Sequence, residues 1–200
     1  MKKITLLIII FIGCNDASAQ HLGYGALFGF NFYDLEIDGP IIADGADSGL
    51  NVGGFVEYQL NNRFGVRGSL IYISIKEGKY DITSNQGVSL FDEAKIKSLQ
   101  IHTLLKYDVS KVYHKGFYFI GGFRMTNVLN VTIDGEKNDD FYKKVNYGGM
   151  LGFGVNSAKH FGIEMLPEVN LTNTLQSKDN KARNYGVYLS FTANIESIIK

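Results

Sequence analysis

Residues Val145 to Val155 read VNYGGMLGFGV, and one half of these side chains alternates with the other. The first set is mostly apolar and comprises Val145, Tyr147, Gly149, Leu151, Phe153 and Val155. The second set comprises Asn146, Gly148, Met150, Gly152 and Gly154. A period of two indicates a β-strand with one apolar face, and the glycines favour close strand approach and curvature. The stretch therefore predicts one strand of a curved sheet.

The same alternation recurs along the whole chain. It predicts further strands at about residues 23–33, 50–60, 63–75, 97–109, 116–126, 160–171 and 184–193. With residues 145–155 the total is eight, an even number. Each segment has the roughly 9–11 residues that a tilted strand needs to cross a bilayer. The predicted fold class is all-β, an eight-stranded antiparallel up-and-down transmembrane β-barrel.

The predicted connections alternate between short and long. The short ones lie at residues 61–62, 111–114 and 157–159, and the long, polar ones at 34–48, 76–95, 127–144 and 172–183. Outer-membrane barrels have short periplasmic turns and long extracellular loops. A soluble barrel has no physical reason to lengthen every second link. The pattern therefore predicts a location in the cell outer membrane.

Six charged residues in the interiors of the predicted strands share the face opposite the apolar set. They are Glu57, Arg67, Lys106, Arg124, Glu164 and Glu168. A Lys or Arg on the lipid face at mid-bilayer costs about 2–4 kcal/mol, so we expect these side chains, with His102, to point into the lumen. Eight strands enclose a space that side chains nearly fill, and buried charges must be paired. We predict a structural polar network there; a lipocalin-like barrel with the faces reversed remains the alternative.

The first residues form a separate segment. Lys2 and Lys3 precede an apolar run, and Ala17-Ser18-Ala19 supplies a small-residue cleavage site. This pattern predicts a signal peptide at residues 1–19 and a barrel domain at residues 20–200. Cys14 leaves a second interpretation open, because lipidation of this residue would make it the mature N-terminus.

Composition excludes some partners and suggests no cofactor. The formal net charge is zero, which offers no electrostatic attraction for nucleic acid. The acidic stretch Asp134, Gly135, Glu136, Asp139 and Asp140 lacks the regular spacing of a calcium-binding loop, so we expect a solvated loop and no metal site. Gly148 and Gly149 are followed by no helix and do not form a phosphate-binding loop.

No arrangement of residues predicts catalysis. His102 is the histidine that falls clearly within a strand, and neither Ser98 nor Ser190 has a spacing that implies a triad. We therefore expect no catalytic residue and no enzyme activity. A lipid A-modifying enzyme remains an alternative, since some outer-membrane barrels of this size act on lipid A.

Two segments carry a family resemblance. Residues 98–107 read SLQIHTLLKY and residues 117–122 read FYFIGG. They resemble the PorT-like outer-membrane β-barrel family of the Bacteroidota, which typically has an L-x-I-P-L-L-L-K-Y strand followed by an aromatic Y-x-x-G-G strand. The chain departs from this pattern at Thr103, where the family usually has Pro, and in running on through residues 194–200.

The resemblance implies fold and location, and a link of named members to protein secretion, but no catalytic residues. Four hypotheses remain. The favoured one is a barrel in outer-membrane lipid, a monomer, whose four long loops bind a protein or another surface ligand. The others are an accessory component of a secretion system, a soluble small-ligand carrier and a lipid A-modifying enzyme.

Overall fold

The computed structural model describes residues 22–38, 41–43, 47–77, 80–84, 87–91, 93–110, 112–138, 142–157, 160–176 and 181–199. The predicted signal peptide and Cys14 lie outside these residues. Within the described ranges, no helix combines the length and the hydropathy needed to span a bilayer.

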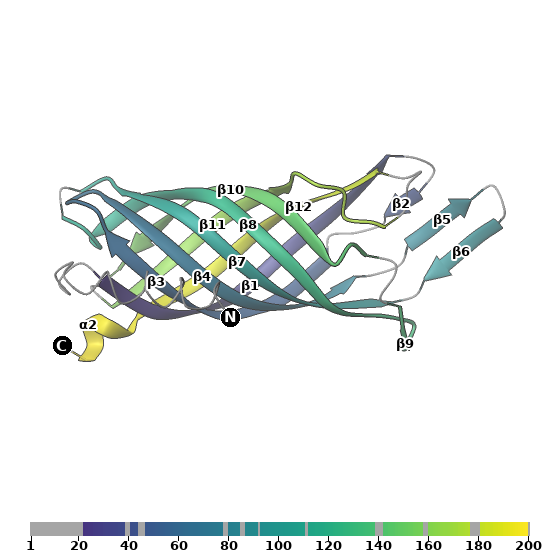
Figure 1. The fold of residues 1–200 in the computed structure, drawn as a ribbon, viewed down its shortest axis with the longest axis horizontal. Coiled ribbons are helices and arrows are strands. Elements are labelled where there is room, and N and C mark those ends of the chain that lie inside the picture. The colour runs from purple at the N-terminus through teal and green to yellow at the C-terminus, as the bar shows by residue number, and fades with distance from the viewer. Residues whose placement is uncertain are drawn as a thin grey trace, which may run out of the picture.

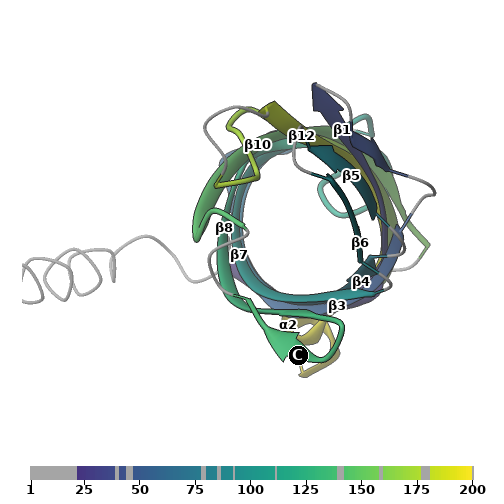
Figure 2. The same ribbon diagram turned by 90° about the vertical axis from the view of Figure 1, so that its right-hand side faces the viewer.

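Long antiparallel strands close into a barrel. They are β1 (Leu22–Asp38), β3 (Asp47–Gln59), β4 (Phe64–Glu77), β7 (Ala94–Asp108), β8 (Gly116–Ile133), β10 (Val145–Asn156), β11 (Phe161–Asn170) and β12 (Lys181–Asn194). Each pairs with the next of this series, and β12 pairs with β1, which closes the ring seen end-on in Figure 2. The predicted eight-stranded up-and-down barrel is confirmed.

The extent of the long loops was predicted wrongly. β1 continues to Asp38 and β8 to Ile133, and the short strands β2 (Ile41–Ala43), β5 (Tyr80–Ser84) and β6 (Gly87–Phe91) form a separate three-stranded sheet. A further pairing joins β8 to β9 (Glu136–Lys137). Backbone hydrogen bonding continues after the outer face turns polar, so hydropathy alternation marks the end of the apolar band and not the end of the strand.

The two ends of the barrel differ. β2, β5, β6 and β9 lie at one end, which we call the loop end (Figure 1, right). The other end, the turn end, carries short links and the helix α2 (Ile195–Ile199), which packs beside β1. The link at 60–63 is held by Asn61, whose Oδ1 accepts hydrogen bonds from the backbone nitrogens of Arg63 and Phe64, both 2.9 Å. Outer-membrane barrels have long loops outside the cell and short turns in the periplasm, so we expect the loop end to be extracellular and the turn end periplasmic.

The outer face is apolar and the inner face holds the charges. Leu151 is 73% exposed and Phe123 67%, although both lie within strands. By contrast, Glu57 is 1%, Arg67 3% and Lys106 0% exposed. A soluble carrier requires the opposite arrangement, because its apolar side chains line the cavity and its charges face water. The lipocalin-like alternative is therefore wrong, and the exterior suits hydrocarbon.

Candidate functional site in the barrel lumen

The predicted lumen residues form two clusters. The first, which we call the turn-end cluster, contains Glu57, Arg67, Lys106 and Glu164. Strand pairing sets Glu57 directly opposite Arg67, and Arg67 Nε donates to Glu57 Oε2 at 2.6 Å. The same guanidinium donates through Nη1 to Glu164 on β11, across the lumen. Lys106 Nζ donates to Glu57 Oε1 at 3.1 Å. Arg67 therefore bridges two carboxylates from different parts of the barrel wall.

Aromatic rings complete this cluster. The hydroxyl of Tyr118 donates to Glu164 Oε1 and that of Tyr113 to Glu57 Oε1, each at 2.6 Å. The Lys106 ammonium lies 4.6 Å from the ring centroid of Tyr113 and 4.5 Å from that of Tyr118. Such cation–π contacts and charge-assisted hydrogen bonds offset part of the cost of burying charge.

His114 closes the cluster at the turn end. Lys106 Nζ lies 3.2 Å from His114 Nδ1, and His114 Nε2 lies 3.3 Å from Glu57 Oε1. An ammonium can only donate, so Nδ1 accepts and the ring proton sits on Nε2, facing the carboxylate. Burial and the neighbouring Lys106 charge lower the pKa of His114 to about 4. The imidazole is therefore neutral at neutral pH and links a cation to an anion.

The second cluster, which we call the loop-end cluster, is organised by Arg124. Its guanidinium donates to Glu168, to Thr126, to Asn170 and, at 2.8 Å, to Asn146 Oδ1. His102 lies opposite Arg124 in the strand register. The arrangement pairs one buried cation with one buried carboxylate, and three further N–H groups of the guanidinium donate to neutral amide and hydroxyl oxygens.

His102 contacts uncharged side chains of this cluster. Its Nε2 lies 2.8 Å from Gln100 Oε1, which also accepts from the hydroxyl of Tyr188 at 2.9 Å. Tyr188 and Tyr33 share a further hydrogen bond of 3.3 Å between their hydroxyls. His102 is thus a hydrogen-bonded interior group, 2% exposed.

An apolar layer separates the two clusters. On β7, Leu104 stands between Lys106 and His102, and on β11, Leu166 stands between Glu164 and Glu168. Leu104 is 3% and Leu166 4% exposed, so both are packed inside the barrel. These buried leucines therefore lie in the path between the two clusters.

One small cavity lies within the loop-end half of the lumen. Its volume is about 30 Å³, and its lining includes Gln100, Arg124, Tyr142 and Asn146. This is enough for about one water molecule. Among the described residues, buried side chains fill the lumen around this cavity.

A filled lumen predicts the absence of a conducting pore. We expect the purified barrel, inserted into planar lipid bilayers in concentrated KCl, to give no stable current steps, because the packed apolar layer would have to open for ions to pass. An open porin measured in the same bilayers is the positive control. Uniform current steps that scale with the amount of inserted barrel would show that the lumen opens.

Sequence reasoning missed four residues of the turn-end cluster. Asp108, whose Oδ2 lies 3.5 Å from Lys106 Nζ, follows the inward alternation of β7 and could have been included. Tyr118 follows the same rule on β8. Tyr113 and His114 lie in a turn, where alternation gives no direction. An indirect signal is Gly65, since a Cβ there would lie 1.6 Å from Tyr113 Oη. Glycine at this position makes room for the ring.

The residues considered as catalytic groups are enclosed. Ser98 is 1% and Ser190 7% exposed, and both face the lumen with His102. The outer wall of the barrel therefore separates these side chains from the lipid that surrounds it.

The acidic stretch after β8 forms a turn. Asp134 and Gly135 both have positive φ, 49° and 86°, as in the two-residue turns that suit hairpins. Asp134 Oδ1 accepts from the backbone nitrogen of Glu93 at 3.0 Å. No group of three potential ligands suited to a metal ion occurs among the described residues; Asp139 and Asp140 lie outside them.

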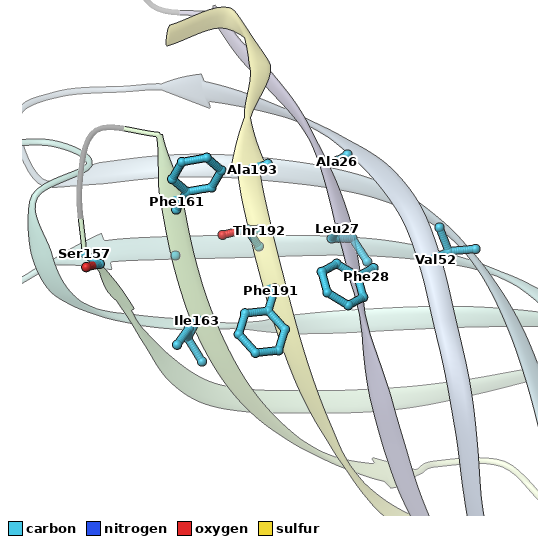
Figure 3. Close-up of a pocket in the computed structure, with 11 residues that line it drawn as sticks. Ala26, Leu27, Phe28, Val52, Ser157, Phe161, Ile163, Phe191, Thr192 and Ala193 are labelled. Atoms are coloured by element: carbon cyan, nitrogen blue, oxygen red, sulfur yellow. The ribbon is translucent and has the colours of Figure 1, made fainter. Parts of the chain in front are cut away.

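The exterior has a shallow groove near the turn end (Figure 3). It measures about 440 Å³, and the small residues Ala26 and Ala193, paired across β1 and β12, form its floor. The rings of Phe28 and Phe191 stack beside it with centroids 5.3 Å apart. Because its walls are apolar, the groove suits lipid hydrocarbon and not a polar ligand.

Comparison with known proteins adds a family and several folds. The sequence model of the outer membrane protein beta-barrel domain matches residues 17–176. A search of curated protein sequences gave no match.

The solved structures that share the fold include Ail, OprG and Neisserial surface protein A. Ail of Yersinia pestis, in complex with the heparin analogue sucrose octasulfate, has 15% sequence identity and a TM-score of 0.53, covering 87% of this chain and 99% of Ail. OprG of Pseudomonas aeruginosa has 17% identity and a TM-score of 0.51, covering 86% of this chain and 96% of OprG. Neisserial surface protein A has 12% identity and a TM-score of 0.55, with coverage of 86% and 96%.

Proposed function

The chain belongs to the outer membrane protein beta-barrel domain family and lies in the outer membrane, and from that premise we propose that it is a closed, non-catalytic barrel that binds a surface ligand through its extracellular loops. One observation carries this proposal. The lumen is filled, whereas the β2–β5–β6 sheet lies beyond the loop end (Figure 1). Transport and catalysis are thus disfavoured inside the barrel, and the loop end offers the area for recognition.

The solved neighbours support a surface role without identifying the ligand. Ail was solved with a heparin analogue. That ligand does not suit the first loop of this chain, because the sequence from 34 to 47 carries five acidic residues and neither Lys nor Arg. A polysulfate would be repelled there, so we expect a ligand of different charge.

Removing the β5–β6 hairpin tests the proposal. Residues 78–92 are replaced by a short Gly-Ser turn, which leaves the apolar band and both lumen clusters intact. We expect heat-modifiable migration in detergent gels to persist, because the barrel still folds. Binding of the reconstituted protein to arrays of immobilised glycans and matrix proteins should fall to background. The proposal fails if the intact protein binds none of these probes, or if the hairpin variant binds them equally well.

A role in protein secretion is the second candidate. The PorT-like resemblance favours it, and so does the turn end, where Ile198 is 53% and Ile199 71% exposed on α2. Exposed isoleucines at the periplasmic end suit contact with a membrane surface or a protein partner. Loss of secreted proteins from a deletion strain would favour this candidate over loop binding, whereas an altered lipid A profile would favour the enzyme hypothesis.

We further propose that residues 1–19 direct export and are removed, with the barrel then acting as a monomer. The order of Lys2 and Lys3, an apolar run and Ala17-Ser18-Ala19 supports cleavage after Ala19. The seven predicted lumen residues serve, in this proposal, as a structural network that keeps the barrel closed.

A further inference from the structure

A cluster of lysines stands on the outer wall at the loop end. Lys76 on β4 and Lys95 and Lys97 on β7 are all exposed. The register sets Lys76 directly opposite Lys95, and Ser74 directly opposite Lys97. These four side chains therefore form a two-by-two grid on the exterior. We call the three lysines of this grid the lysine patch.

The lysine patch borders the apolar band. The next outward pair toward the turn end is Tyr72 and Leu99, followed by Leu70 and Ile101. A strand rises about 3.3 Å per residue, so one outward pair lies about 7 Å from the next. The ammonium groups of the patch consequently lie at the level where a hydrocarbon layer gives way to lipid headgroups, on the extracellular side.

The patch has more positive charge than its described neighbours neutralise. Lys95 pairs with Glu93 at 2.7 Å, but the two side chains are 51% and 47% exposed. Glu93 itself lies beside Asp134 at the β8–β9 turn. An exposed pair of this kind contributes little stability.

Glu93 also interacts with the charge of Lys76, but on the flanking strands β3 and β8 Lys76 and Lys97 both face neutral residues. The residue opposite Lys76 on β3 is Ser48, and the residue opposite Lys97 on β8 is Asn130. Like charges directly opposite each other destabilise a sheet, so an anion bound over the grid would remove an unfavourable interaction.

We propose that the lysine patch, with the Ser74 hydroxyl, binds the phosphate groups of the glycolipid in the outer leaflet, lipid A. Phosphate accepts hydrogen bonds from ammonium and hydroxyl donors. Basic side chains at the membrane surface recognise anionic headgroups in the same way. The patch lies on the wall below the loops, so this binding is separate from ligand recognition by the loops. It would orient the barrel in the lipid and fix its depth.

The test compares two triple variants in neutral-lipid nanodiscs. One carries K76Q, K95Q and K97Q; the matched control, K115Q, K143Q and K144Q, removes three lysines elsewhere. Heat-modifiable migration shows that each folds. We measure binding of lipid A, of dephosphorylated lipid A and of inorganic phosphate. For the patch variant we expect lipid A affinity to fall at least about ten-fold, since each lysine at a membrane surface contributes substantially, while the control changes less than about two-fold.

Three results would overturn the proposal. Equal losses in the two variants would show general surface charge and no defined patch. Undiminished binding of dephosphorylated lipid A would exclude the phosphate groups. Binding of inorganic phosphate as tight as that of lipid A would show a free-anion site and not a headgroup site.

Discussion

Replacing Arg67 with Met should destabilise the folded barrel by about 3–5 kcal/mol, the range for removing one partner of a buried charge pair. Arg67 is 3% exposed and donates to both Glu57 and Glu164. Without it, both carboxylates stay buried in the turn-end cluster. The measurement is the urea midpoint of unfolding in lipid vesicles, followed by heat-modifiable migration.

The contacts also predict which second substitution restores stability. Glu57 keeps Lys106 as a donor after Arg67 is removed, whereas Glu164 keeps the neutral hydroxyl of Tyr118. Without Arg67, Glu164 is therefore the buried carboxylate that lacks a cationic partner, and it destabilises the barrel more than Glu57 does. Arg67→Met combined with Glu164→Gln should recover more stability than Arg67→Met combined with Glu57→Gln. Equal recovery by the two double variants would contradict this ordering.

A surface arginine supplies the control. Arg63 lies in the turn before β4, where Nη1 donates to Tyr107 Oη at 3.1 Å. Arg63→Met should cost less than about 1 kcal/mol, as for other exposed polar contacts. If Arg67→Met costs no more than Arg63→Met, the turn-end cluster does not stabilise the barrel.

Period-two alternation was sufficient to predict the number of strands and the direction of most side chains. Arg124, for example, alternates with Phe123, and the structure leaves Phe123 67% and Arg124 3% exposed. A charge within a strand has one acceptable direction when one face meets hydrocarbon. Whether a side chain points into the lumen or toward lipid can therefore be predicted from its own segment of sequence.

The height of a residue along the barrel axis cannot be predicted from its own segment of sequence, and this limited the prediction of contacts. All seven lumen residues were predicted as one network, but strand register separates Arg124 and Glu168 from Arg67 and Glu57. Which side chains meet across the lumen depends on the tilt and stagger of all strands together. No single segment contains that information.

The inner face also proved less polar than expected. Ile71, Ile73 and Ile75 on β4 are all 5% exposed or less and point inward. In this strand both faces are apolar, so alternation weakens as a signal. Buried isoleucine fills volume that a polar side chain could occupy only with hydrogen-bonding partners.

Placing an arginine at the middle of the outer wall should be nearly as damaging as removing Arg67. Leu151 lies at the centre of β10 and is 73% exposed on the outer face. Leu151→Arg should cost about 2–4 kcal/mol, the penalty for a cation on the lipid face at mid-bilayer. Urea unfolding in vesicles measures the loss, and slower insertion into vesicles should accompany it.

The same substitution near the membrane surface provides the matched comparison. Leu171 is 58% exposed and follows the end of β11, next to Thr172, whose Oγ1 accepts from the backbone nitrogen of Tyr147 at 3.0 Å. Leu171→Arg should cost only about 0–1 kcal/mol, because an arginine at the interface can reach water and headgroups. If a bilayer surrounds the barrel, the loss of stability caused by the arginine thus depends on its depth in the bilayer. In water, two exposed leucines of similar accessibility would respond alike, so equal costs at 151 and 171 would mean that this wall does not face lipid.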